Sequence, residues 1–269
     1  MRIVFIGCGN MGEAILSAVL DKKLFLPQDI SVSDIDENRR QYIQQKYNVG
    51  VTSNNQMAIT RSDVIILAVK PQSLTKVMAE IKGQIKITQL VISIIAGAKL
   101  DTLSNGLNHH MVARAMPNTP SQIGEGITTW ITTSQVTEQQ KTTVNAIFDT
   151  IGKEIHVDSE EYLDMTTAVS GSGPAYFFLF VEALTEAAIN IGLPQDLAHE
   201  LVLQTMFGSG QLIKKSEKDP SELRKMVTSP GGTTAEALLV LEKGGFTSLL
   251  RQALSAAHNK AKKLGEEIQ

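Results

Sequence analysis

Short apolar runs alternate with amphipathic stretches along the first part of the chain, up to about Val157. The expected strands are Ile3–Ile6, Ile30–Ser33, Val64–Val69, Leu90–Ile95, Met111–Ala115, Thr128–Thr132 and Glu154–Val157. Helical spacing lies between them at Met11–Leu20, Glu37–Tyr47, Ser73–Ile81 and Thr137–Phe148. Almost wholly apolar strands are typical of a parallel sheet that helices cover on both faces. The alternation therefore predicts a doubly wound α/β domain over residues 1–157.

The pattern changes after Val157, where helical segments rich in alanine and leucine dominate. The segment Tyr176–Ile191 is apolar nearly all round, and Glu182 and Glu186 are its only charged residues. Such a helix is usually buried, often against another subunit. Further helices are expected after Pro194, after Pro220, and over Thr234–Lys243 and Phe246–Glu267. Residues 158–269 are therefore expected to form an all-helical second domain.

Composition narrows the class of protein. A length of 269 residues fits about two domains, and a net charge of −3 gives no indication of a nucleic-acid partner. The single cysteine, Cys8, excludes an internal disulfide and a cysteine-based zinc cluster. Val64–Val69 and Leu90–Ala96 are far shorter than the roughly 18 apolar residues of a membrane span. We expect a cytoplasmic protein without a metal site or a membrane partner.

The run Gly7-Cys8-Gly9-Asn10-Met11-Gly12 has the form G-x-G-x-x-G and stands between the first expected strand and helix. Gly7 allows the tight turn, Gly9 lets a pyrophosphate approach the backbone, and Gly12 lets the helix pack closely on the strand. The helix N-terminus offers free N–H groups to the phosphates, here those around Asn10 and Met11. The motif predicts a Rossmann-type dinucleotide site, in which Cys8 is a small filler.

Asp34 ends the second expected strand, at the distance from Gly12 where an acid that binds the ribose is expected. Its carboxylate favours the free 2′-hydroxyl of NAD, because it would repel a 2′-phosphate. Arg39 and Arg40 follow shortly afterwards and can either clamp that phosphate or lie in a solvated helical turn. Both cofactors therefore stay open.

Three further segments follow the carboxyl ends of expected strands, where open α/β sheets bind their ligands. In Val69-Lys70-Pro71, Lys70 can reach the cofactor. A surface lysine at the end of a strand, without a ligand, explains the same residue equally well. Ala96-Gly97 leaves room for a ring against the backbone, and Asn118 can offer its amide to the nicotinamide or the substrate.

Two runs of small residues interrupt the helical part, at Ser170-Gly171-Ser172-Gly173-Pro174 and Ser229-Pro230-Gly231-Gly232-Thr233-Thr234. The second leads into a helix and can hold an anion such as a carboxylate on its backbone N–H groups. A capped helix start without a ligand is the more common explanation of such a run.

Taken together, these motifs resemble those of the pyrroline-5-carboxylate reductases, in the same order along the chain. The resemblance extends from Ile3 to about Leu264 and is carried by Gly7–Gly12, Ala68–Pro71, Arg114–Pro120, Val169–Tyr176 and Ser229–Thr234. It implies reduction of Δ1-pyrroline-5-carboxylate to L-proline with NADPH or NADH. It also implies that the helical domain forms a homodimer, often assembled further into a decamer.

The same resemblance assigns roles within the run from Ser229 to Thr234. Ser229, Gly231, Gly232 and Thr233 would hold the substrate carboxylate, and Thr234 would hydrogen-bond the ring nitrogen. This loop would complete the site of the partner subunit. One departure is the turn from Ser33 to Asp36, which replaces a hydroxyl-rich turn of members that prefer NADPH and puts that preference in doubt. Hydride would pass directly to the C=N carbon, without a metal or a covalent nucleophile.

Two other readings compete with this one. Hydroxyacid dehydrogenases and related imine reductases have a similar two-domain layout. The hydroxyacid enzymes carry a catalytic lysine on the long interdomain helix, but Tyr162–Leu193 contains no Lys, Arg or His. A non-catalytic dinucleotide sensor would bind NADH without consuming it when pyrroline-5-carboxylate is added.

Overall fold

The computed structural model describes residues 1–267, which divide into two compact units. Unit 1 comprises Met1–Ser172 and the chain from Ala256 onward, and unit 2 is Gly173–Ser255. The last helix, α12 (Phe246–Glu267), contributes its first part to unit 2 and its end to unit 1. α7 (Glu161–Thr166) belongs to unit 1, because its Asp164 pairs with Arg114 of the sheet.

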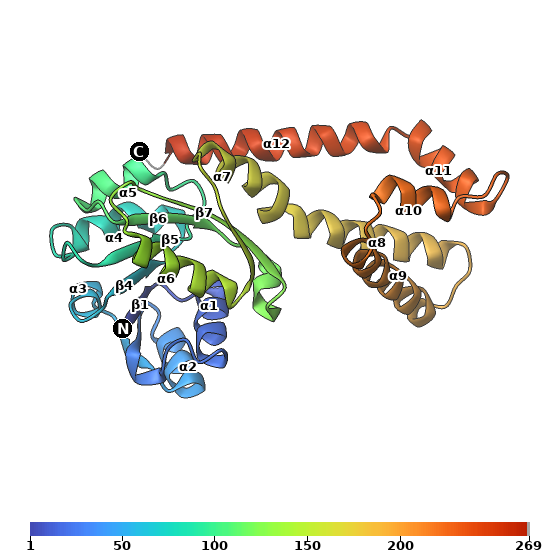
Figure 1. Cartoon of the computed structure of the whole chain (residues 1–269). Helices are drawn as coiled ribbons and strands as arrows, with labels where there is room; N and C mark the ends of the chain where they lie inside the picture. The colour runs from blue at the N-terminus through green and yellow to red at the C-terminus, as the bar shows by residue number, and fades with distance from the viewer. Residues whose placement is uncertain (268–269) are drawn as a thin grey trace. The chain divides into compact units, whose positions relative to one another are not determined.

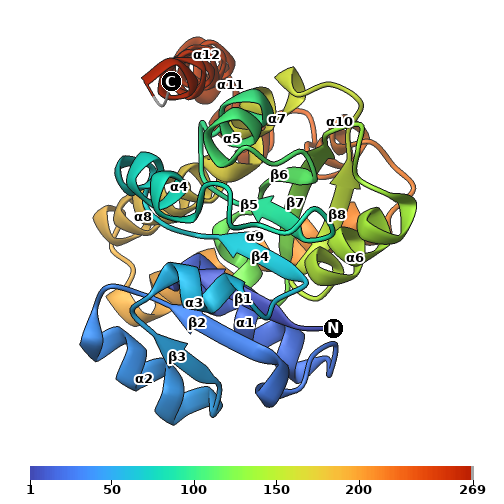
Figure 2. The same cartoon turned by 90° about the vertical axis from the view of Figure 1, so that its left-hand side faces the viewer.

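Unit 1 is built on a single eight-stranded sheet in the order β3-β2-β1-β4-β5-β6-β7-β8 (Figures 1 and 2). All neighbouring strands pair in parallel except β6 and β7. The strands are β1 (Ile3–Ile6), β2 (Ile30–Ser33), β3 (Gly50–Thr52), β4 (Val64–Leu67), β5 (Leu90–Ser93), β6 (Val112–Met116), β7 (Gly126–Thr132) and β8 (Gly152–His156). This arrangement confirms the predicted doubly wound α/β fold.

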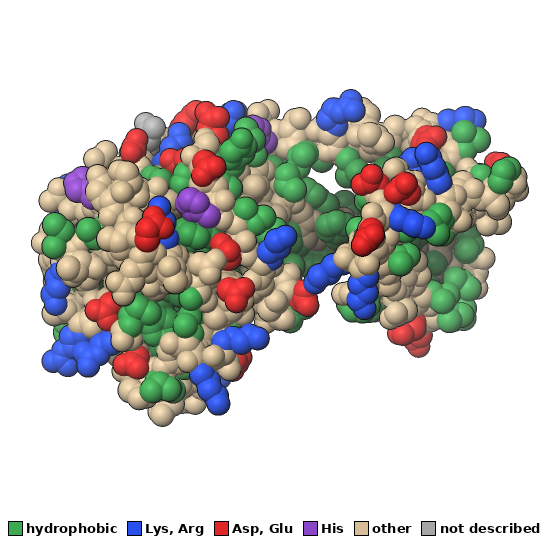
Figure 3. Space-filling model, viewed as in Figure 1, with side chains coloured by type: hydrophobic (Ala, Val, Ile, Leu, Met, Phe, Trp, Pro, Cys, Tyr) green, Lys and Arg blue, Asp and Glu red, His purple; other side chains and the backbone are tan. Residues whose placement is uncertain are grey.

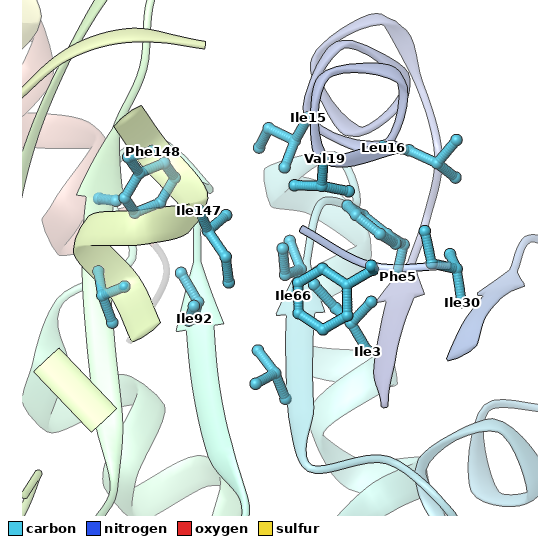
Figure 4. Packing of buried hydrophobic residues seen from close by; sticks show 14 of the residues in the cluster. Ile3, Phe5, Ile15, Leu16, Val19, Ile30, Ile66, Ile92, Ile147 and Phe148 are labelled. Carbon is cyan, nitrogen blue, oxygen red and sulfur yellow. The ribbon is translucent and has the colours of Figure 1, made fainter. Parts of the chain in front are cut away.

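Two hydrophobic clusters lie on opposite faces of this sheet. Successive side chains of a strand point to opposite faces, so Ile3 and Phe5 join one cluster while Val4 and Ile6 join the other. In Figure 4, Val19 of α1 packs over Phe5 on the first face, where α6 contributes further apolar side chains. The helices are α1 (Asn10–Asp21), α2 (Glu37–Tyr47), α3 (Asn55–Ile59), α4 (Leu74–Ile81), α5 (Leu100–Leu107) and α6 (Glu138–Asp149), with short 3-10 turns at Pro27–Asp29, Pro71–Ser73 and Thr119–Ile123.

The predicted strands and helices of this region are all present, with ends displaced by at most a few residues. Three short elements were missed: β3, α3 and α5. The sequence of α5, Leu100–Leu107, contains Ser, Asn and Gly, which are poor helix formers. Burial of its Leu100, Leu103 and Leu107 against the sheet outweighs that preference.

A buried ion-pair cluster joins α7 to the sheet. The side chain of Arg114, on β6, is 4% exposed and donates to Glu160 at 2.8 Å and to Asp164 at 2.7 Å. Glu160 also accepts the Leu100 N–H at 2.8 Å, so one carboxylate links α5, α7 and the strand. Each charged group in this cluster therefore has a partner of opposite charge, as burial requires.

Unit 2 consists of helices with extensive exposed apolar surface. They are α8 (Gly173–Asn190), α9 (Gln195–Lys215), α10 (Pro220–Met226), α11 (Thr233–Lys243) and the start of α12, preceded in unit 1 by a π-helical turn at Thr167–Gly171. α8 and α9 pack on each other, yet Phe177, Leu179 and Phe207 are each at least 60% exposed. Figure 3 shows hydrophobic side chains, in green, on the surface of this part of the chain. The expected burial of α8 is thus not achieved within one chain. Apolar patches of this kind mark protein-protein contacts.

None of the helices within residues 1–267 combines the length and the apolar character that a membrane span requires.

We predict that Arg114→Met destabilises the protein by about 3–5 kcal/mol, because it leaves the carboxylates of Glu160 and Asp164 without their cation. The matched control is Lys141→Met, which removes an exposed pair with Glu138 and should cost no more than about 1 kcal/mol. Urea unfolding of both variants measures the difference. Equal midpoints for the two variants would contradict the structural role assigned to Arg114.

Candidate functional site

The turn after β1 has the geometry that its three glycines were predicted to allow. Gly7 has φ +81°, and a Cβ there would lie 2.8 Å from Val69 Cγ1. At position 12 a Cβ would lie 3.2 Å from the Gly7 carbonyl oxygen and 3.4 Å from the Ala68 Cβ. Both positions are therefore closed to larger residues by close packing between the turn, α1 and the segment after β4.

Gly9 is different, because the space next to it is open. A Cβ at this position would meet no atom within 4 Å. Gly9 is also the N-cap of α1, and no side chain caps the first turn through it. The N–H groups of this turn, around Asn10 and Met11, thus face a free approach to the backbone. This cradle fits the pyrophosphate of a dinucleotide.

Asp34 lies at the rim of the same turn. Its Oδ2 accepts the Cys8 N–H at 2.9 Å, and its Oδ1 accepts the Asp36 N–H at 3.0 Å. Gly7 is tied to the same strand end, since its N–H donates to the Ser33 carbonyl at 2.7 Å. The structure thus brings the predicted ribose-binding acid and the glycine turn together.

A charged cluster on α1 and α2 surrounds Glu13, a residue that the sequence analysis did not single out. Arg39, Tyr42, Lys46 and Tyr47 all donate to its carboxylate. Burial by itself raises the pKa of Glu13, but the hydrogen bonds from Tyr47, Lys46 and Arg39 outweigh it and lower the pKa to about 2. The position of Glu13 in the first turn after the glycine motif was the available signal.

Cys8 is fully buried inside the turn, and burial raises the pKa of its thiol to about 12. A thiol of this kind is not a nucleophile at neutral pH, which agrees with the predicted filler role. Within residues 1–267, no three His, Cys, Asp or Glu side chains are grouped as a metal site would need.

The segments after β4 and β5 lie at the same edge of the sheet as the glycine turn. Val69 touches the turn, Lys70 is exposed, and Pro71 opens a 3-10 turn. Ala96 is partly buried, while Gly97 has φ +79° and packs under the end of α12. A Cβ at position 97 would lie 2.9 Å from the Leu264 carbonyl carbon, so this glycine has a packing role of its own.

Asn118 also has a structural partner. It follows β6 and is largely buried, and its Oδ1 accepts the Ile127 N–H at 2.9 Å. The amide oxygen therefore joins the segment after β6 to β7. This contact orients the Asn118 side chain at the carboxyl edge of the sheet.

In unit 2, the segment Ser229–Gly232 forms a tight turn before α11. The Gly232 N–H donates to the Ser229 carbonyl at 3.0 Å, and Gly231 has φ +69°. Proline followed by glycine suits this turn, because the second central residue needs a positive φ. Gly232 is the N-cap of α11 without a side-chain cap, so the turn presents the N–H groups around Thr233 and Thr234.

Comparison with known proteins defines the class first. A family model described as NADP oxidoreductase, coenzyme F420-dependent, matches residues 2–97, and the pyrroline-5-carboxylate reductase dimerisation model matches residues 160–264. With the fold and the glycine turn, these matches define a dinucleotide-dependent oxidoreductase whose helical part is similar to a dimerisation domain.

Individual relatives identify the family more narrowly than these two family models do. The chain is 41% identical to the pyrroline-5-carboxylate reductase of Synechocystis sp., covering 99% of both chains. It superposes on the solved pyrroline-5-carboxylate reductase of Coxiella burnetii with a TM-score of 0.90 and 37% identity, covering 98% of each chain. For the Plasmodium falciparum enzyme with NADP bound, the TM-score is 0.89 and the identity 31%, with the same coverage. The chain belongs to the pyrroline-5-carboxylate reductase family.

We predict that Gly9→Ala lowers cofactor affinity with little loss of stability. The added methyl group fills the open approach to the backbone, while the change at the N-cap costs about 1 kcal/mol at most. Gly7→Ala is the contrasting variant, because a Cβ there meets Val69 and a positive φ, and we expect a loss of at least about 1 kcal/mol. Calorimetric cofactor titration and thermal unfolding separate the two effects. Unchanged affinity in Gly9→Ala would contradict the assigned approach.

Proposed function

We propose that this chain reduces Δ1-pyrroline-5-carboxylate to L-proline with hydride from NADPH or NADH. One observation carries the proposal: α1 and α11 both begin after a glycine N-cap that provides no side-chain cap. Each helix start therefore offers backbone N–H donors to an anion. The reaction needs two such places, one for the cofactor pyrophosphate and one for the substrate carboxylate.

The cofactor is assigned to the carboxyl edge of the sheet in unit 1. The glycine turn would supply the N–H groups for the pyrophosphate, and Asp34, whose carboxylate accepts the Cys8 N–H beside this turn, would bind the adenosine ribose. The segments after β4 and β5 extend the binding edge toward the nicotinamide. The proposed contacts are Gly7, Gly9, Asn10, Met11, Gly12, Asp34, Val69, Lys70, Pro71, Ala96 and Gly97.

The substrate is assigned to the turn before α11. Its carboxylate would be held at Ser229, Gly231, Gly232 and Thr233, mainly through the backbone N–H groups that the turn leaves free, since the Gly232 N–H donates to the Ser229 carbonyl. Backbone N–H groups suit a substrate charge that does not change in the reaction. The Thr234 hydroxyl would hydrogen-bond the ring nitrogen. Asn118 would add an amide contact from its place after β6.

In the chemical step, the main role of the protein is to position the substrate against the cofactor. A reduced nicotinamide, when bound, would supply the hydride. The electrophilic carbon of the protonated imine would accept it as the C=N bond becomes a C–N bond. The nitrogen keeps its proton and gains the electron pair of the C=N bond. The chain contributes orientation and exclusion of water, and Thr234 holds the nitrogen at the distance that the transfer needs.

The assembly is proposed from the helical part of the chain. Residues 1–157 would form the dinucleotide-binding domain, and residues 158–269 the dimerisation and substrate domain. The exposed apolar side chains of α8 and α9 would be covered in a homodimer, with a decamer as a higher assembly. In that dimer the Ser229–Thr234 loop would complete a site of the partner. We place the enzyme in the cytoplasm, without a nucleic-acid or membrane partner.

The decisive experiment measures absorbance at 340 nm with purified protein, either cofactor, and pyrroline-5-carboxylate. We expect oxidation of NADH or NADPH only when the substrate is present, with proline as the product. Cofactor binding without turnover would instead identify a dinucleotide sensor and overturn the proposal.

Thr234→Ala is expected to lower kcat/KM by about 10- to 100-fold, the effect of losing one hydrogen bond to a charged group. Cofactor affinity should stay the same, because Thr234 is assigned to the substrate alone. Thr234→Ser keeps the hydroxyl and serves as the control, with activity close to that of the unchanged chain. An equal loss of cofactor affinity in Thr234→Ala would refute this role.

A further inference from the structure

The end of β2 carries opposing charges beside the place assigned to the adenosine ribose. Asp34 favours a free 2′-hydroxyl, whereas an arginine near the same position can accept a 2′-phosphate. The sequence offers Arg39 and Arg40 for that purpose. The hydrogen-bond partners of these two side chains therefore show whether either is available to a 2′-phosphate.

Arg39 is committed to the protein. Its Nε donates to the Cys8 carbonyl at 2.6 Å, and its Nη2 donates to the Gly9 carbonyl at 3.4 Å and to Glu13. Its side chain is only 23% exposed. The Arg39 guanidinium binds two carbonyls of the glycine turn and so holds this turn in place. Because the group is planar and rigid, it cannot also be directed toward a phosphate.

Glu13 keeps Arg39 in this position. The Glu13 side chain is 16% exposed, and its second oxygen, Oε1, is fixed by Lys46 at 2.9 Å and Tyr47 at 2.7 Å. Moving Arg39 to a phosphate would leave a half-buried carboxylate without one of its two cations. The cluster therefore opposes such a movement.

Arg40 and Asp34 are also tied together. Arg40 Nη1 donates to the backbone carbonyl of Asp34 at 2.8 Å. Both oxygens of the Asp34 side chain accept backbone N–H groups, from Cys8 and Asp36, which fixes the carboxylate at the rim of the turn. A 2′-phosphate placed there would meet a fixed negative charge, and like charges in contact cost several kcal/mol.

We propose that Asp34 makes this chain select NADH over NADPH, and that Arg39 is a positioning residue of the glycine turn rather than a ligand of the 2′-phosphate. This inference rests on the proposed function, since it assumes that the turn holds a dinucleotide. It adds the cofactor selected and the residue that selects it.

The test is calorimetric titration of the full chain with NADH and with NADPH, in parallel with steady-state assays. The unchanged chain should bind NADH at least about tenfold more tightly than NADPH, which corresponds to ~1.4 kcal/mol. Asp34→Ser should shift the affinity ratio at least about tenfold toward NADPH, because it replaces the negative charge with a neutral hydroxyl. Tighter binding of NADPH by the unchanged chain would overturn the proposal.

Arg39→Gln separates positioning from phosphate binding. If Arg39 only holds the turn, this variant weakens both cofactors by the same factor, and the ratio stays within about twofold. A selective loss of NADPH affinity would show that Arg39 binds the phosphate and would overturn its assigned role. Arg40→Gln is the matched control at the neighbouring cation and should also leave the ratio unchanged.

The same affinity and activity measurements separate failure of the proposed NADH preference from failure of the proposed function. An enzyme that reduces pyrroline-5-carboxylate but prefers NADPH retains the proposed function and contradicts only the role of Asp34. A chain that binds neither cofactor contradicts both.

Discussion

Burial of the central parallel strands on both faces is the constraint on which the rest of unit 1 depends. β1 places Ile3 and Phe5 in one cluster and Val4 and Ile6 in the other, so helices must cover both faces. The crossing of the chain from one face to the other happens around β1, which lies between β2 and β4. The carboxyl ends of these three strands therefore meet, and the glycine turn, Asp34 and Val69 are brought together by topology alone.

Charged groups then fix what apolar packing leaves adjustable. Arg114 joins α7 to β6 through two carboxylates, and Arg39 joins α2 to the carbonyls of the glycine turn. Hydrophobic contact is non-directional, whereas a guanidinium fork binds its partners at defined positions. The two arginines thus fix the position of α7 against β6 and of α2 against the glycine turn.

The sequence predicted the fold and the glycine cradle because both depend on local patterns. Apolar runs such as Ile3–Ile6 and the spacing of Gly7, Gly9 and Gly12 can be read without knowing any neighbour. The sequence does not predict the structural roles of Glu13 and Arg114, because their partners lie far along the chain, 26 to 34 residues away for Glu13 and 46 to 50 for Arg114. For Arg39, the sequence leaves open a phosphate ligand or a solvated helical turn. Its hydrogen bonds to the carbonyls of the glycine turn cannot be predicted from spacing. The roles from Ser229 to Thr234 stay predictions, because they depend on a substrate and an assembled dimer.

The contact between Gly97 and α12 bears on how alignments of this family are interpreted. A side chain at position 97 would run into the backbone of Leu264, which cannot rotate away, and Gly265 in turn lies over the Gly97 carbonyl oxygen. An invariant glycine at position 97 would therefore follow from packing even if no cofactor touched it. Conservation of glycine at position 97 would thus be evidence of packing against α12 as much as of contact with the nicotinamide. Covariation between positions 97 and 265 would indicate packing as the cause.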